Sequence, residues 1–82
     1  MYYLYLLSCS DATLYAGITT DLTRRVVEHN STTRGAKYTL VRRPVVLVYS
    51  KKFRNRSLAS VAESKLKKLS RAEKLALIDK IV

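Results

Sequence analysis

The sequence predicts an α+β domain in which helices flank a three-stranded antiparallel sheet, with the elements in the order β-β-α-β-α-α. Two short apolar and aromatic runs near the N-terminus are separated by turn-forming residues, which is typical of a hairpin. A segment with helical periodicity separates this hairpin from a third, β-branched run, and two further amphipathic segments close the chain. The 82 residues contain no repeat, low-complexity tract or linker, so we expect one domain over residues 1–82.

The first two strands are expected over residues 2–7 and 13–18, with turn-forming residues between them. If the turn centres on Ser10, residues whose numbers sum to 20 pair across the hairpin. Tyr5 would then lie directly opposite Tyr15 on one face of the sheet. The hairpin therefore predicts that these two tyrosines meet.

A helix is predicted next, with Thr20 as its N-cap and Asn30 as a residue that can end it after about His29. Asp21 adds an acid to the first turn, which suits the helix dipole. The residues of its core stripe are Leu22 and Val26. The residues of an adjoining polar stripe at the same spacing are Asp21, Arg25 and His29. One face of this helix thus anchors it, and the next face presents an arginine and a histidine together.

A polar, basic loop is expected over residues 31–43, and after it a β-branched run at residues 45–49 is typical of a buried strand. Ser57 can cap the second helix, and Ser70 with Glu73 forms a capping box at the start of the third. The predicted core stripe of the second helix is Leu58, Ala62, Leu66 and Leu69. The predicted inward residues of the third helix are Leu75, Ile78 and Val82.

The charge indicates a polyanionic partner. Lys and Arg total 16 against 6 Asp and Glu, a net charge of +10, and no acid occurs between Glu28 and Glu63. Such a charge destabilises a small fold through self-repulsion, and binding to a polyanion offsets this. A solvated basic face that only keeps the protein soluble is the alternative. Nucleic acid is the partner that the sequence favours.

A membrane partner is not expected. No amphipathic basic helix stands apart to lie on anionic lipid, and no apolar run approaches the roughly 18–20 residues that span a bilayer. The N-terminus reads as a strand and not as a signal peptide. The single cysteine, Cys9, excludes an internal disulfide and a Cys-rich zinc site, and is interpreted as a bystander in a turn. We therefore predict a cytoplasmic protein.

Several kinds of catalytic site are excluded by composition. The chain has one histidine, no Gly-x-Ser-x-Gly elbow, and only two glycines, so it holds neither a serine hydrolase triad nor a glycine-rich phosphate loop. The polar residues that remain and could meet are Tyr5, Tyr15, Arg25, His29 and Glu63. Each has a structural alternative: the tyrosines as core aromatics, Arg25 as an ion pair with Asp21, His29 as a helix C-terminal residue, and Glu63 as a pair with Lys67.

Taken together, these residues resemble the GIY-YIG nuclease domain. Tyr3-Leu4-Tyr5 is followed ten residues after Tyr5 by Tyr15-Ala16-Gly17, then by Arg25, His29 and a lone Glu63 on a later helix. The resemblance covers nearly the whole chain and is closest to the small stand-alone members. It implies a GIY-YIG-like fold and a metal-dependent DNA endonuclease, in DNA repair or recombination. Two departures are Tyr3 in place of the usual glycine and the lack of a late asparagine that some members carry.

The resemblance also implies roles. Tyr5 and Tyr15 match the two family tyrosines, of which the first positions or deprotonates water. Arg25 matches the arginine that grips the scissile phosphate, and His29 a histidine that assists the nucleophile. Glu63 matches the sole carboxylate that binds a single Mg²⁺ or Mn²⁺, and Gly17 lets the backbone pack closely beside the site. Because a tyrosine of ordinary pKa is a poor base at pH 7, the choice of general base among the two tyrosines and the histidine stays open.

DNA is the expected substrate, RNA is not excluded, and a monomer is expected. The cations expected to grip phosphates without reading bases are Arg24, Arg34, Lys37, Arg42 and Arg43. Cleavage is therefore predicted to be structure-directed or nonspecific. The alternative function is a noncatalytic nucleic-acid-binding module that keeps the nuclease fold. A third hypothesis is an interaction domain that serves another enzyme, although no protein partner is indicated.

Overall fold

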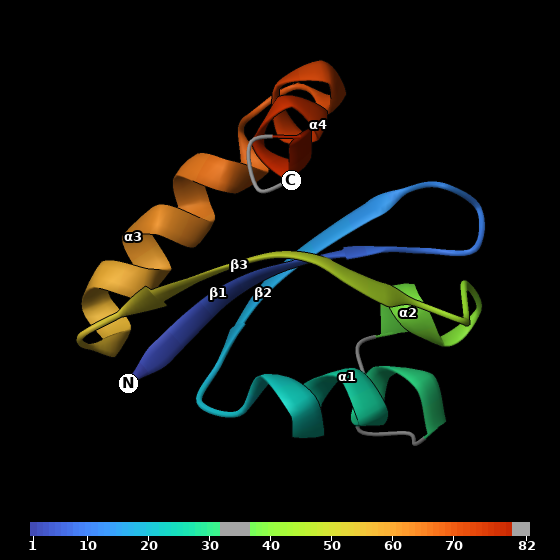
Figure 1. Ribbon diagram of the computed structural model, residues 1–82, viewed down its shortest axis with the longest axis horizontal. Coiled ribbons are helices and arrows are strands. Elements are labelled where there is room, and N and C mark those ends of the chain that lie inside the picture. Colours follow the sequence, from blue (N-terminus) through green and yellow to red (C-terminus); the bar gives the residue numbers. More distant parts are fainter. Residues whose placement is uncertain (32–36, 80–82) are drawn as a thin grey trace.

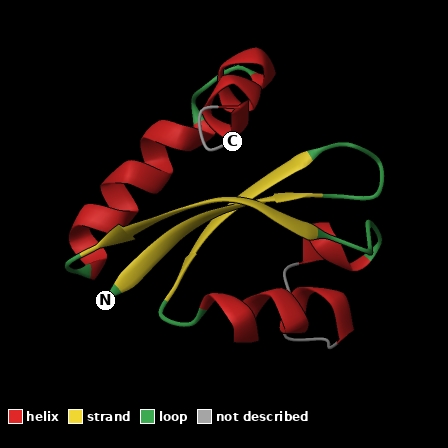
Figure 2. Cartoon of the chain, viewed as in Figure 1, coloured by secondary structure: helices red, strands yellow, loops and turns green. Residues whose placement is uncertain are grey.

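The predicted fold class is confirmed, and the predicted elements occur in the expected order with one additional short helix. The computed structural model describes residues 1–31 and 37–79, and Figures 1 and 2 show their arrangement. The strands of the described residues are β1 (Tyr2–Ser8), β2 (Leu14–Thr19) and β3 (Val46–Phe53). The helices are α1 (Leu22–Ser31), α2 (Lys37–Leu40), α3 (Arg56–Lys67) and α4 (Arg71–Asp79). The short α2 lies within the segment that was predicted to be a loop. None of these helices is long and apolar enough to cross a membrane.

The three strands form one antiparallel sheet in the order β2-β1-β3. The central strand β1 is buried from Leu4 to Leu7 because it has a neighbour on both sides and helices on both faces. Alternate side chains of a strand point to opposite faces, so β1 contributes to two separate cores.

The predicted hairpin register is wrong by two residues. Tyr5 pairs with Gly17 and Tyr15 pairs with Leu7, so the turn centres on Asp11. The carboxylate of Asp11 accepts a hydrogen bond from the Thr13 backbone N–H at 3.1 Å and stabilises this turn. A shift of two residues leaves every side chain on its predicted face, so Tyr5 and Tyr15 still share one face of the sheet.

The helices cover the two faces of the sheet in pairs, as Figure 1 shows. On the Leu4 face, α3 and α4 pack through Leu66 and Ile78. On the Tyr5 face, α1 packs through Leu22 and Val26, the stripe that the sequence predicts. The chemistry of the predicted site residues therefore has to be sought between the sheet and α1.

The predicted ends of α1 and the predicted burial of β3 need correction. Asp21, and not Thr20, caps α1, because its carboxylate accepts the backbone N–H of Arg24 at 3.1 Å. The helix does not end at Asn30, whose amide instead exchanges two hydrogen bonds with the Val45 backbone at 2.7 and 3.0 Å. β3 is an edge strand and is only partly buried, in contrast to the predicted buried strand.

In α3 the predicted cap is also wrong, since Asn55 and not Ser57 accepts the Leu58 backbone N–H at 2.9 Å. The predicted core stripe is confirmed at Ala62, Leu66 and Leu69. It is wrong at Leu58, which is 48% exposed, while the neighbouring Ala59 is fully buried.

The capping box of α4 is confirmed, because Ser70 and Glu73 exchange backbone-to-side-chain hydrogen bonds at 2.9 and 3.2 Å. Ile78 packs inward as predicted, whereas Leu75 is 40% exposed. Val82 lies outside the described residues.

Candidate active site

The hydroxyl of Tyr5 is the centre of a buried polar cluster on the α1 face of the sheet. It lies 2.9 Å from Nε2 of His29 and accepts a hydrogen bond from Nε of Arg25 at 3.4 Å. Both partners project from α1 at i and i+4, as the polar stripe in the sequence predicts. Tyr5 is 2% exposed, so these contacts form out of bulk water, where electrostatic interactions are strong.

Gly17 provides the floor on which the Tyr5 ring lies. A β-carbon placed on Gly17 would overlap the Tyr5 hydroxyl oxygen and would approach Cζ to 2.6 Å. No larger residue fits there without moving the ring. This is the close packing that the resemblance implies for Gly17.

His29 is fully buried between two rings and a hydroxyl. Its ring makes edge-on contacts with Tyr5 and Tyr15, with centroids 5.8 and 5.4 Å apart. Its Nδ1 lies 2.7 Å from Oγ1 of Thr39, which is fully buried in α2. Burial, with a smaller effect of Arg25, lowers the pKa of His29 from 6.5 to about 4, so the ring is neutral at pH 7.

Burial raises the pKa of Tyr5, while the hydrogen bond from Arg25 opposes that rise. Tyr5 is therefore protonated at pH 7. The charges of Tyr15 and Glu63 contribute smaller increases to the same pKa. Glu63 on α3 is thus within electrostatic reach of Tyr5, although it belongs to a helix that packs on the other face of the sheet.

Arg25 pairs with Glu28 at 3.1 Å instead of with Asp21, the alternative that the sequence suggested. Its side chain is 25% exposed, so the guanidinium reaches from the buried hydroxyl of Tyr5 to the surface. Arg43 fixes the end of the same helix by donating to the backbone oxygen of His29 at 2.6 Å. The cluster is therefore held from both the sheet and the segment before β3.

Glu63 is the carboxylate that the resemblance predicts as the cation ligand, and within residues 1–31 and 37–79 no three His, Cys, Asp or Glu side chains gather. Its side chain is 23% exposed and lies 3.6 Å from Nζ of Lys67, the pair that the sequence offered as an alternative. Mg²⁺ accepts such a setting, because it keeps several waters and often takes only one or two protein carboxylates. The residues present therefore fit a hard cation held mainly by water and substrate oxygens.

The cations expected to bind phosphate differ in their surroundings. Arg24 and Lys37 are exposed. Arg42 makes an ion pair with Asp11 at 3.0 Å and lies 4.0 Å above the Tyr38 ring, so it connects α2 to the hairpin turn. Arg43 donates a hydrogen bond to the backbone oxygen of His29 and so contacts the end of α1. Arg34 lies outside the described residues.

Sequence reasoning missed Thr39 and Tyr38. Tyr38 stacks on Tyr15, with ring centroids 5.7 Å apart and an interplanar angle of 26°. Both residues come from α2, which is too short to give a periodic signal. The run Lys37-Tyr38-Thr39 in an otherwise polar segment is the only local hint of these contacts.

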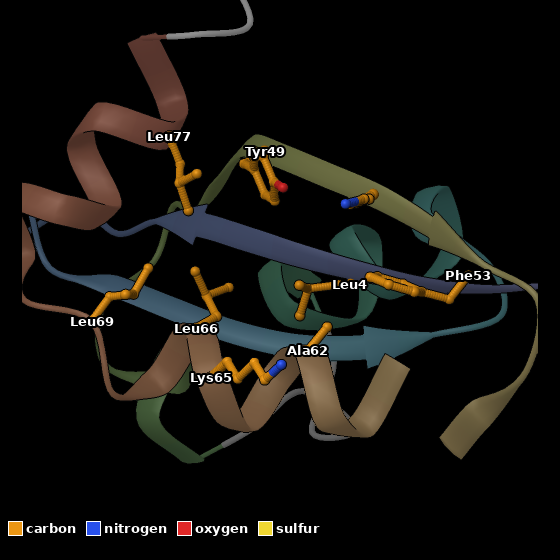
Figure 3. A pocket seen from close by; sticks show the side chains of 9 residues that line it. Leu4, Tyr49, Phe53, Ala62, Lys65, Leu66, Leu69 and Leu77 are labelled. Atoms are coloured by element: carbon orange, nitrogen blue, oxygen red, sulfur yellow. The ribbon is translucent and has the colours of Figure 1, made fainter. Parts of the chain in front are cut away.

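A cavity of about 210 Å³ lies on the opposite face, between the sheet and helices α3 and α4 (Figure 3). Apart from Lys51 and Lys65, its lining is carbon-rich, with Leu4, Phe53 and Leu66 among the contributors. Its lining contains no carboxylate, histidine or arginine, so the polar cluster around Tyr5 is the better candidate site.

Comparison with known proteins places this chain and its fold in a family. Residues 1–76 match the GIY-YIG catalytic domain. The chain is 49% identical to a UPF0213 protein of Halobacterium salinarum over 77 residues, which are 94% of this chain and 99% of that protein. A UPF0213 protein of Syntrophus aciditrophicus is 51% identical over 76 residues, 93% of this chain and 87% of that protein.

Solved structures agree with this placement. The solution structure of a UPF0213 protein from Bacillus halodurans superposes with a TM-score of 0.61 at 40% identity, covering 96% of this chain and 84% of that chain. A protein of Enterococcus faecalis gives the same TM-score at 44% identity, covering 93% and 81%. The chain therefore belongs to the GIY-YIG catalytic-domain family, as a small UPF0213 protein.

Proposed function

We propose that this protein is a divalent-metal-dependent endonuclease that hydrolyses phosphodiester bonds in DNA. The observation that carries the proposal is the Tyr5 hydroxyl, buried between Nε2 of His29 and Nε of Arg25 above the backbone of Gly17. A buried hydroxyl with a neutral histidine on one side and an arginine on the other can move a proton beside a bound anion.

In this proposal Tyr5 positions the attacking water and takes its proton. Because the pKa of Tyr5 is raised, the side chain enters the reaction protonated and must pass its own hydrogen on. The neutral ring of His29, 2.9 Å away, is the acceptor. This assigns the general base to Tyr5 and His29 acting together, and leaves Tyr15 to position His29 through its ring contact.

Arg25 binds the scissile phosphate. Its guanidinium presents several donors in one plane, which suits two phosphate oxygens at once. Its Nε is engaged by Tyr5 and its Nη1 by Glu28, so the group is already oriented before substrate binds. Such fixed donors stabilise the additional charge of the transition state.

Glu63 would hold the cation. A bound Mg²⁺ or Mn²⁺ supplies charge neutralisation on phosphate oxygens and lowers the pKa of water. The half-buried position of Glu63 on α3, within electrostatic reach of Tyr5, supports this assignment. Lys67 would have to release the carboxylate, because their ion pair occupies one of its oxygens.

The substrate is bound through its backbone. A net charge of +10, with Arg24 and Lys37 exposed, supports phosphate contacts that carry no base information. We therefore propose structure-directed or nonspecific cleavage by a cytoplasmic, monomeric protein acting in DNA repair or recombination.

The test compares wild type with Glu63→Gln and Arg25→Ala on duplex, single-stranded, flap and four-way-junction DNA, with and without Mg²⁺ or Mn²⁺. We expect metal-dependent cleavage that falls at least about 100-fold in both variants. Arg71→Ala, a loss of one positive charge on the exposed start of α4, is the matched control and should cleave like wild type. Intact DNA in every wild-type reaction would contradict the proposal.

A noncatalytic binding module is the second candidate, and the Glu63–Lys67 ion pair favours it. A carboxylate already neutralised by a lysine is a weaker cation ligand. This candidate predicts salt-sensitive DNA binding by wild type and Glu63→Gln alike, with no cleavage by either. The same set of reactions, read for binding as well as cleavage, separates the two functions.

A further inference from the structure

We propose that Thr39 sets which nitrogen of His29 carries the proton, so that Nε2 is free to accept the hydrogen of Tyr5. This positioning role rests on the function proposed above and goes beyond the residues to which the resemblance assigns a role. The observation is a hydroxyl-to-imidazole contact of 2.7 Å between Oγ1 of Thr39 and Nδ1 of His29, with both residues fully buried.

Counting hydrogens in the buried cluster favours one arrangement. A neutral imidazole carries one N–H and one lone pair. If Nδ1 carries the hydrogen, it donates to Thr39, Nε2 accepts from Tyr5, and the Tyr5 oxygen still accepts from Arg25. The Tyr5 hydroxyl and both ring nitrogens of His29 then have partners of the right kind, in keeping with the described residues, whose buried side-chain polar atoms are all paired.

The other arrangement leaves the Tyr5 hydrogen without one of the partners that the described residues give it. If Nε2 carried the hydrogen, it would donate to the Tyr5 oxygen, which already accepts from Arg25. The hydrogen of Tyr5, a residue that is only 2% exposed, would then need a different acceptor. A threonine hydroxyl has two lone pairs, so Thr39 accepts from Nδ1–H when its own hydrogen points away from His29.

The short helix α2 is fixed in a way that suits a positioning role. Tyr38 stacks on Tyr15, and Arg42 covers Tyr38 while pairing with Asp11 in the hairpin turn. The backbone N–H of Arg42 also donates to the Thr39 carbonyl at 3.0 Å. These contacts hold the Thr39 hydroxyl against His29 from the side opposite to Tyr5.

The proton transfer then balances. Water gives its proton to the Tyr5 oxygen as the hydrogen of Tyr5 moves to Nε2 of His29. The water oxygen bonds to phosphorus, and the bond from phosphorus to the leaving oxygen breaks. The leaving oxygen takes a proton from solvent, and the imidazolium later returns one to solvent, with Nδ1–H donating to Thr39 throughout.

The experiment uses the fact that the chain has one histidine, so its ¹⁵N NMR signals need no assignment. In wild type at pH 7 we expect Nδ1 protonated and Nε2 unprotonated. Thr39→Ser should keep this tautomer, whereas Thr39→Val, nearly isosteric but without an acceptor, should move the hydrogen toward Nε2. Thr23→Val, at an exposed threonine of α1, is the control and should leave the spectrum unchanged.

Cleavage assays give the second readout. We expect Thr39→Val to cleave about 10- to 100-fold more slowly than wild type and Thr39→Ser to remain within a few-fold. An Nε2-protonated tautomer in wild type overturns the inference, and that measurement needs no variant to fold. A Thr39→Val protein in which the tautomer of His29 is unchanged also overturns the inference. A wild-type protein with the expected tautomer that cleaves no DNA would overturn the nuclease proposal but support the assignment of Thr39.

Discussion

At the scale of single residues, the Tyr5 hydroxyl connects the sheet to α1 through hydrogen-bonding contacts. It contacts Nε2 of His29 at 2.9 Å and Nε of Arg25 at 3.4 Å, and Gly17 lies under its ring. Two of these contacts come from α1 and one from β2, while Tyr5 itself belongs to β1. Small displacements of this one side chain should therefore alter both the packing and the proposed chemistry.

Substituting Gly17 by alanine tests the packing. Because a β-carbon would approach Cζ of Tyr5 to 2.6 Å and would overlap its hydroxyl, we expect the free energy of unfolding to fall by about 1–3 kcal/mol. Urea denaturation measures this. Ser50→Thr, which adds a methyl group at the exposed partner of Tyr5 on β3, is the matched control and should change stability by less than about 0.5 kcal/mol. Equal effects of both variants would contradict the close packing.

Residue spacing predicts part of the cluster. Arg25 and His29 share a helix stripe because they are four residues apart, and Tyr5 shares a face with Tyr15 because strand positions of equal parity do so. Thr39 had no such signal. It meets His29 across the ten residues that separate them, through a segment without helical or strand periodicity.

At the scale of elements, the order of strands and helices follows from periodicity, but the turns do not. The hairpin turn centres on Asp11, whose side chain accepts from Thr13, and Ala12 adopts a left-handed backbone with φ of 67°. A residue other than glycine in that region is uncommon, so sequence rules for short turns placed the centre one residue too early. The same limitation applies to α3, where two candidate caps lie two residues apart.

The cap of α3 gives a direct comparison of the two candidates. Asn55→Ala removes the side-chain oxygen that accepts the Leu58 backbone N–H, so we expect a loss of about 1 kcal/mol of unfolding free energy. Ser57→Ala, at the position that the sequence favoured, lies inside the helix and should change stability by less than about 0.5 kcal/mol. Thermal unfolding of both variants measures the difference, and the reverse order would place the cap at Ser57.

At the scale of the whole molecule, the sheet separates a polar cluster from an apolar core. The face toward α1 and α2 carries the polar cluster, and the face toward α3 and α4 carries an apolar core with its cavity. Glu63 is the exception, because it comes from α3 and acts electrostatically on Tyr5. The proposed metal site therefore depends on how α3 sits beside the sheet, which local sequence patterns do not specify.

The stability of the whole domain should depend on the charge state of His29. Its pKa is about 4 in the folded protein and 6.5 when unperturbed, so between these values the unfolded chain binds the extra proton. The free energy of unfolding is then expected to fall as pH decreases from 7 to 4, by about 3 kcal/mol in total. Urea denaturation at several pH values measures this. In His29→Gln the free energy of unfolding should no longer change between pH 6.5 and 5. If the change persists in this variant, other titrating groups cause it.

The most direct test of the proposed chemistry removes one oxygen atom. Tyr5→Phe keeps the ring on Gly17 but deletes the hydroxyl that joins His29 to Arg25. Single-turnover cleavage and binding of the same labelled DNA should be measured for wild type and variant in Mg²⁺ or Mn²⁺. We predict that cleavage falls by about 100-fold or more while the dissociation constant changes by less than a few-fold. Cleavage by Tyr5→Phe at the wild-type rate would contradict a catalytic role for the buried cluster.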